Sequence, residues 1–223
     1  RAVLCYPLVG LVIGGLLWGL VWTLAQVCPG ATAAPLAALC LIAWVWLTGG
    51  LHLDGLADSA DAWVGGLGDR ARTLEIIRDP HIGAMGALTL GLVLIGKWSA
   101  LLSLIAADDL LPLFWVPVLG RTQVMVLMLT TPYARPGGMA AQAVACLPRG
   151  PAWVVVGLAL SLVALAESLG GGWGLPLLVA GITLILWRRA MVRRLGGFTG
   201  DTAGALVELT ETAVLLVLAL GSA

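Results

Sequence analysis

The chain has 223 residues, of which 60% are hydrophobic and 11% are charged, and its mean hydropathy is +1.03. This composition excludes a soluble globular protein, in which about a quarter of the residues are charged. The 12 Lys and Arg residues balance the 12 Asp and Glu residues, so the chain lacks the basic excess typical of nucleic-acid-binding proteins. We therefore expect an all-α protein: one transmembrane catalytic domain over residues 1–223, built as a polytopic membrane helix bundle.

Seven apolar segments are long enough, or nearly so, to cross a bilayer as helices, because a span needs about 20 residues. They are residues 3–27, 33–51, 83–107, 111–130, 153–166, 173–187 and 203–220. The segments at 153–166 and 173–187 are short and are separated by Glu167 and three glycines at 170–172, so we expect a tight hairpin of two spans there. The four cysteines lie far apart in the sequence, and we expect them to be reduced and buried.

The arginines outside the spans all lie on one side of the expected bilayer. Loops 52–82, 131–152 and 188–202 fall on the same side as Arg1 and contain Arg70, Arg72, Arg78, Arg135, Arg149, Arg188, Arg189, Arg193 and Arg194. The loops on the opposite side contain no Lys or Arg. Because cytoplasmic loops are enriched in these residues, we expect a cytoplasmic N-terminus and a C-terminus on the far side.

The first of these loops begins with carboxylates that are spaced for one face of a helix. Asp54, Asp58 and Asp61 stand at positions i, i+4 and i+7, within an arc of about 60°. Carboxylates on one face repel each other unless a cation lies between them, and carboxylates with water suit Mg²⁺. The sequence therefore indicates a Mg²⁺ site, and the alternative is a solvated polar face on a cytoplasmic helix.

The same loop continues through glycines and arginines to the next span. Glycines let a backbone approach phosphate closely, and Arg side chains supply forked donors to its oxygens. Arg78 and Asp79 lie where the chain re-enters the membrane, just before Gly83 and Gly86, which makes them the favoured candidates for the site. The alternative for the arginines is a topology signal with lipid-headgroup contacts.

Two histidines flank the acidic loop, at His52 and His81. Each could position a phosphate or move a proton, because the ordinary pKa of histidine is close to physiological pH. The alternative for each is a hydrogen-bonded residue at the membrane interface.

The last span carries a second group of acids. Asp201 and Glu208 share a helix face, and Glu211 follows at i+3 from Glu208. Acids that deep in an apolar helix are costly unless they face protein, water or a cation. Pairing with Lys97 or Arg121, which lie within other spans, is the alternative to a catalytic role, and both interpretations place these groups inside the bundle.

Three ordered motifs resemble the cobalamin synthase family, adenosylcobinamide-GDP ribazoletransferase. They are residues 49–61 (GGLHLDGLADSAD), 74–86 (LEIIRDPHIGAMG) and 196–208 (GGFTGDTAGALVE). The first ten residues are similar to the start of the family's first span, so the resemblance covers essentially the whole chain. The sequence departs from the family at residues 79–81, where Asp-Pro-His stands in place of Asp-Ser and a variable residue.

The resemblance implies the last step of cobalamin nucleotide-loop assembly, with Mg²⁺, at the bacterial inner membrane. In that reaction a ribose hydroxyl of α-ribazole, or of its 5′-phosphate, attacks adenosylcobinamide-GDP and GMP leaves. The expected partners are these two substrates and the lipid bilayer, without nucleic acid. Because a corrinoid is large and this bundle is small, a second copy or another enzyme of the pathway could extend an open cytoplasmic cavity.

Site roles follow from the needs of diphosphate chemistry, which are charge neutralisation, alignment and a base. We expect Asp54, Asp58, Asp61, Asp79 and Asp201 to hold metal, with Asp61 as the candidate general base. We expect Arg78, Lys97 and Arg121 to cover the diphosphate, and Glu208 and Glu211 to orient a cation or a ribose hydroxyl. Substrate contacts are expected at His52, Gly83, Gly86, Thr199, Glu208 and Glu211.

Two other functions use similar residues. CDP-alcohol phosphotransferases also place several aspartates at a membrane face, but after Asp54 and Gly55 the arginine of their signature is missing and Asp58 is out of register. A cation channel or carrier would also place charges within spans. Here the acids gather at one end of the expected bundle and do not line a path across it.

Overall fold

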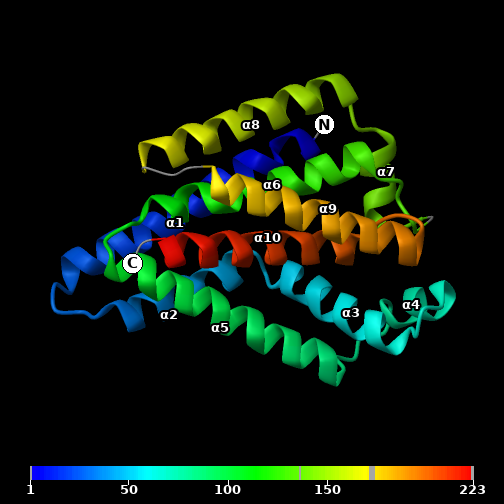
Figure 1. Ribbon diagram of the computed structural model, residues 1–223, viewed down its shortest axis with the longest axis horizontal. Coiled ribbons are helices and arrows are strands. Elements are labelled where there is room, and N and C mark those ends of the chain that lie inside the picture. The colour runs from blue at the N-terminus through cyan, green and yellow to red at the C-terminus, as the bar shows by residue number, and fades with distance from the viewer. Residues whose placement is uncertain (1, 136, 171–173, 222–223) are drawn as a thin grey trace.

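The computed structural model describes residues 2–135, 137–170 and 174–221, and these residues form a bundle of helices along one long axis (Figure 1). A short 3₁₀ helix, Ala2–Cys5, precedes α1 (Tyr6–Val27), α2 (Ala33–Leu47), α3 (Leu51–Gly65), α4 (Arg70–Ile76), α5 (Ala84–Ala106), α6 (Leu111–Thr130), α7 (Met139–Ala145), α8 (Arg149–Leu169), α9 (Leu175–Leu195) and α10 (Gly200–Gly221). The all-α fold is therefore as predicted.

Six of these segments are long and apolar enough to cross a membrane, namely Ala2–Val27, α5, α6, α8, α9 and α10. The pair α2 and α3 also passes this test, but the two helices are bent by 85° relative to each other. The chain is a multi-pass membrane protein. The expected span at 33–51 ends earlier than predicted, at Leu47, because Gly49 and Gly50 adopt φ values of +62° and +69° that break the helix.

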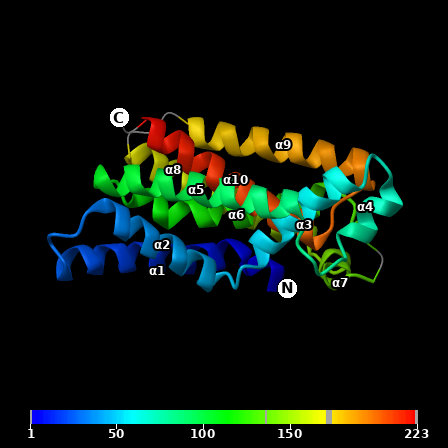
Figure 2. The ribbon, with the colours of Figure 1, turned by 90° about the horizontal axis from the view of Figure 1, so that it is seen from below.

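Most connections between helices lie at two opposite ends of the bundle (Figures 1 and 2). The links from α1 to α2 and from α5 to α6 lie at one end, and α4 and α7 lie at the other. The expected loop at 188–202 is too long, because α9 continues to Leu195 and includes Arg188–Arg194 as helical residues. Arg1 and the glycines at 171 and 172 lie outside the described residues.

The cysteine prediction is half right. All four cysteines are free, but only Cys40 is buried, whereas Cys5, Cys28 and Cys146 are exposed. Apolar surroundings in the sequence do not distinguish burial against protein from exposure on the outer face of a bundle, since both environments are apolar in a membrane.

The helices α6 and α10 form the centre of the bundle. Buried residues make up 83% of the apolar window of α6 and 61% of that of α10, against 28% or less in the other spans. The α6 helix packs against α1, α8 and α10, and α10 packs against α3, α5 and α9. Side chains of α3, α5 and α6 that point toward α10 therefore lie inside the protein.

Two glycines one turn apart let α1 lie directly on α6. A Cβ atom on Gly10 would stand 2.5 Å from the carbonyl oxygen of Pro117, and one on Gly14 would clash with the carbonyl oxygen of Phe114. Small residues at such spacing allow helix backbones to approach closely in a membrane, where packing drives association.

We predict that Gly14→Ala destabilises the protein by about 1–3 kcal/mol, because the added methyl overpacks the α1 and α6 contact. The matched control is Gly19→Ala on the same helix, where a Cβ meets nothing within 4 Å and alanine favours the helix. Thermal unfolding of both variants in detergent tests this. Equal unfolding temperatures would contradict the packing argument.

Candidate active site

The acidic stripe lies on one helix, as predicted. Asp54, Asp58 and Asp61 all belong to α3. The buried residues Leu53, Leu56 and Ala57 lie on the remaining surface of α3, outside this acidic stripe. The helical spacing of apolar and acidic residues therefore sets which side of α3 packs and which side presents carboxylates.

Glycines bring α3 and α10 into backbone contact. A Cβ on Gly55 would lie 2.5 Å from the carbonyl oxygen of Asp201, and one on Gly204 would lie 3.1 Å from the Cα of His52. Gly55 therefore leaves no room for a side chain, and Gly204 leaves very little. This contact sets the first turn of α10, which carries Asp201, beside the acidic face of α3.

The carboxylates of this face repel one another. Partial burial, and then the nearby charges of Asp54, Asp201, Asp61 and Asp79, raise the pKa of Asp58 to about 6. The first turns of α5 and α10 lie beside α3, because Gly86 contacts Asp61 and Gly55 contacts the backbone of Asp201. Such a concentration of negative charge favours a bound cation.

The carboxylates of this face suit Mg²⁺ only as part of its set of ligands. Among the residues that the structure describes, no group of three His, Cys, Asp or Glu side chains is arranged to hold a metal ion by itself. Mg²⁺ is usually held by one or two carboxylates, with waters and substrate phosphates filling the remaining positions. Asp54, Asp58 and Asp201 therefore do not form a complete metal site, and an ion there would take one or two of these carboxylates together with water and substrate oxygens.

Arg135 is a site residue that the sequence analysis treated only as a topology signal. Its Nη1 donates to Oδ2 of Asp201 over 3.3 Å. The segment before it is tied to the start of α10, because Ala134 N donates to Phe198 O at 2.8 Å and Phe198 N donates to Pro132 O at 3.0 Å. No local pattern signals this role, since it depends on pairing of two segments far apart in the sequence.

Asp61 turns toward α5. One of its carboxylate oxygens accepts the Gly83 N–H at 2.7 Å and the other accepts the Gly86 N–H at 2.9 Å. Free N–H groups at a helix start bind anions, and here the anion belongs to the chain itself. The metal and base roles of Asp61, and the substrate contacts of both glycines, stay predictions.

Arg78, Asp79 and His81 are exposed, on the segment between α4 and α5. The His81 ring Nδ1 lies 2.7 Å from Oδ1 of Asp79, which also accepts the His81 backbone N–H at 3.0 Å. These hydrogen bonds hold the pKa of Asp79 below its usual range. Arg78 and Asp79 line a shallow hollow against α4, and the charge of Asp79 also acts on Asp58. The expected roles of Arg78 and Asp79 stay predictions.

Thr199 is fully buried beside the start of α10. Its backbone N–H donates to the Thr202 hydroxyl at 2.9 Å, and its own hydroxyl accepts the Thr202 N–H at 3.2 Å. This reciprocal pairing satisfies donors at the helix start in the manner of a capping box. The Thr199 hydroxyl also donates to Asp201 at 3.3 Å, so Thr199 lies beside the carboxylate of Asp201.

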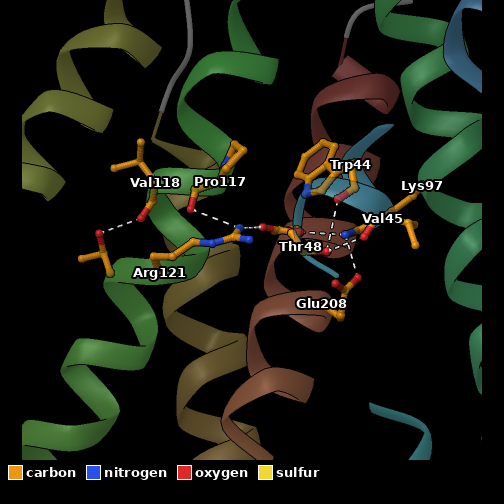
Figure 3. Close-up of polar contacts among 10 residues, drawn as sticks. Trp44, Val45, Thr48, Lys97, Pro117, Val118, Arg121 and Glu208 are labelled. Carbon is orange, nitrogen blue, oxygen red and sulfur yellow. Dashed lines mark hydrogen bonds and ion pairs between the residues drawn. The ribbon is translucent and has the colours of Figure 1, made fainter. Parts of the chain in front are cut away.

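The charges within the spans form one buried cluster around α10. Lys97 of α5 donates to Glu208 and to Glu211, each at 2.7 Å, and Arg121 of α6 pairs with Glu211. Figure 3 shows Lys97 and Arg121 approaching from opposite sides, with Trp44 beside the Lys97 ammonium. These four charged side chains are each 5% exposed or less, and two positive charges balance two negative ones. This arrangement is the pairing that the sequence analysis left as the alternative.

We predict that Lys97→Met destabilises the fold by about 3–5 kcal/mol, because it leaves a net negative charge buried in the bundle. Adding Glu208→Gln to this variant restores charge balance, so the double variant should recover part of the lost stability. Thermal unfolding in detergent of the single and double variants measures the difference. A double variant less stable than Lys97→Met would contradict the charge-balance account.

Comparisons with known proteins agree with this architecture and site. A family model described as cobalamin-5-phosphate synthase matches residues 1–219. Adenosylcobinamide-GDP ribazoletransferase of Stutzerimonas stutzeri is 52% identical over 99% of this chain and 87% of its own length. The proteins of the same name from Pseudomonas savastanoi and Pseudomonas syringae are 50% and 51% identical, each over 99% of this chain and 88% of their own length. No solved structure matches. The chain belongs to the cobalamin-5-phosphate synthase family.

Proposed function

We propose that this chain catalyses the reaction for which its relatives are named, the transfer that joins ribazole to adenosylcobinamide-GDP. The observation that carries the proposal is the acidic face of α3 and α10. There Asp54, Asp58 and Asp201 gather beside Arg135 at one end of a membrane bundle. A diphosphate substrate needs this combination of cation-binding carboxylates and a guanidinium.

The bond changes define what the site must do. An oxygen of the ribose hydroxyl forms a new bond to the phosphorus nearer the corrinoid arm, and the bond from that phosphorus to the bridging oxygen breaks. GMP leaves with the bridging oxygen and its electron pair, and the hydroxyl proton passes to a carboxylate of the acidic face that binds no metal. Negative charge grows on the bridging oxygen during this exchange, so catalysis requires positive charge there and an aligned nucleophile.

We assign Mg²⁺ binding to one or two of the carboxylates of Asp54, Asp58 and Asp201, with water and substrate phosphate oxygens as the other ligands. The ion would neutralise charge that develops on the diphosphate. Arg135 is positioned by Asp201 and presents its guanidinium to the same face, where it can bind a phosphate oxygen through forked donors. Asp61, with both oxygens bonded to α5, holds the entry of that helix against the site.

We assign the buried cluster a role other than the diphosphate binding that the sequence analysis expected of Lys97 and Arg121. Lys97 is 2% exposed and is fully engaged by two carboxylates, so we assign it a positioning role. It fixes α10 against α5, and α10 carries Asp201.

A charge-balanced cluster closed to solvent also gives no support to a cation channel or carrier. The names of the relatives favour the ribazole transfer over a CDP-alcohol phosphotransferase.

We predict that Asp58→Asn and Asp201→Asn each lower kcat by at least about 100-fold, because a metal site supplies several kcal/mol of charge stabilisation. Release of GMP from adenosylcobinamide-GDP, with α-ribazole and Mg²⁺, is the measurement. Asp108→Asn is the matched control, since Asp108 lies at the opposite end with φ +56° and Asn tolerates that conformation.

Two results would contradict the assignment. One is normal turnover and Mg²⁺ dependence in folded Asp58→Asn protein. The other is an equal loss of activity in the Asp108→Asn control, which would indicate a general sensitivity to loss of carboxylates.

We further propose that the arginine-rich end faces the cytoplasm of a bacterial inner membrane, following the excess of Lys and Arg in cytoplasmic loops. Two exposed cysteines mark the two ends. Cys28 ends α1 at the end away from the acidic face, and Cys146 ends α7 at the acidic end.

In single-cysteine variants, a membrane-impermeant maleimide added to intact spheroplasts should label Cys28 and leave Cys146 unlabelled until the membrane is opened. The reverse pattern would place the acidic face on the outside and contradict the proposed orientation.

A further inference from the structure

A cavity of about 350 Å³ lies between α1, α6 and α10, next to the acidic face. Its walls are largely apolar and include Ile13 of α1, Val124 and Met128 of α6, and Val207 of α10. Ala140 of α7 and Phe198 line it as well. A volume of this size matches a small-molecule pocket.

Four polar side chains line the cavity, those of Tyr6, Thr48, His52 and Arg121. The Thr48 hydroxyl is already bonded to the carbonyl oxygens of Trp44 and Val45. The Nδ1 atom of His52 is buried and has no hydrogen-bond partner within the described part of the chain. Because an unpaired buried polar atom is costly, this nitrogen indicates a ligand that completes its hydrogen bond. The Arg121 guanidinium is anchored by Glu211 and by the carbonyl oxygen of Pro117, so it is held against the cavity.

The cavity borders the carboxylates of the acidic face. Gly200 lines the cavity and is followed directly by Asp201. His52 and Asp58 lie on the same helix, and six helical residues rise about 9 Å. A ligand seated here therefore lies within one nucleoside length of the place where the diphosphate is expected.

The chemistry of the walls separates the candidate ligands. A guanine ring carries many donors and acceptors, and an apolar cavity with few polar groups would leave them unpaired at a high cost. A benzimidazole ring is largely apolar, needs one or two hydrogen bonds and presents a face that a guanidinium attracts. The mostly apolar walls of this cavity therefore favour the second ring.

We infer that this cavity binds the benzimidazole base of ribazole and directs the attached ribose toward the acidic face, an inference that rests on the proposed function. His52 hydrogen-bonds the bound nucleoside, and Arg121 lies against its ring. The buried cluster then has two roles. It balances charge inside the bundle, and its Glu211 positions the Arg121 guanidinium that contacts the base.

Ala140→Phe tests the inference, because it adds a large side chain at the α7 wall of the cavity. The KM for α-ribazole should rise by at least about tenfold, a typical effect of a changed apolar pocket. The kcat at saturating α-ribazole and the KM for adenosylcobinamide-GDP should stay unchanged. Ala145→Phe, at an exposed position on the same short helix, is the matched control and should alter neither KM.

The outcomes separate this inference from the proposed function. Wild-type protein that is folded but releases no GMP contradicts the proposed function. Active wild-type protein with both KM values unchanged in Ala140→Phe overturns the inference alone. A rise in the KM for adenosylcobinamide-GDP in place of that for α-ribazole would assign the cavity to the other substrate and would also overturn it.

A second measurement uses only the wild-type protein and so does not depend on how a variant folds. Free benzimidazole should inhibit GMP release competitively against α-ribazole and should not compete with adenosylcobinamide-GDP. Inhibition that is competitive with neither substrate, as expected if a lipid chain fills the cavity, would overturn the inference.

Discussion

The contact between α3 and α10 is the constraint on which the rest of the site depends. Gly55 meets the backbone of Asp201, and Gly204 meets the backbone of His52. A side chain at position 55 would force the two helices apart. Because of this contact, carboxylates that are about 145 residues apart in the chain share one face. The same contact sets His52 beside the cavity that we assign to the ribazole base. The acidic face and the proposed pocket therefore belong to the same pair of helices.

The helix α10 joins this site to the interior of the bundle. Its first turn carries Asp201, and its middle carries Glu208 and Glu211, which bind Lys97 and Arg121. Removing any one of these charges from an apolar interior would leave its partners uncompensated. The cluster therefore restricts how α5, α6 and α10 can be arranged, and it fixes the side chain of Arg121 against the cavity. Stability and substrate recognition depend here on the same ion pairs.

The sequence predicted features that depend on local periodicity and missed those that depend on distant contacts. Helical spacing was enough to place Asp54, Asp58 and Asp61 on one face, and the apolar runs identified the spans. Nothing local indicated that Arg135 would reach Asp201, because a bridge between Tyr133 and Phe198 brings these segments together. The hydrogen bonds from Gly83 and Gly86 to Asp61 were missed for the same reason. Backbone N–H groups at the start of a span can bind a phosphate or a carboxylate of the chain equally well.

The most direct test of the account is binding of Mn²⁺, as a spectroscopic substitute for Mg²⁺, to the purified protein in detergent with GDP as the diphosphate. Electron paramagnetic resonance counts the free ion and gives its affinity without any turnover. The account predicts that the wild-type protein with GDP binds Mn²⁺ more tightly than GDP does alone, and that a variant with Asn at positions 54, 58 and 201 does not. Equal binding by the wild-type protein and this folded variant would contradict the claim that the α3 and α10 face is the metal-binding and diphosphate-binding site.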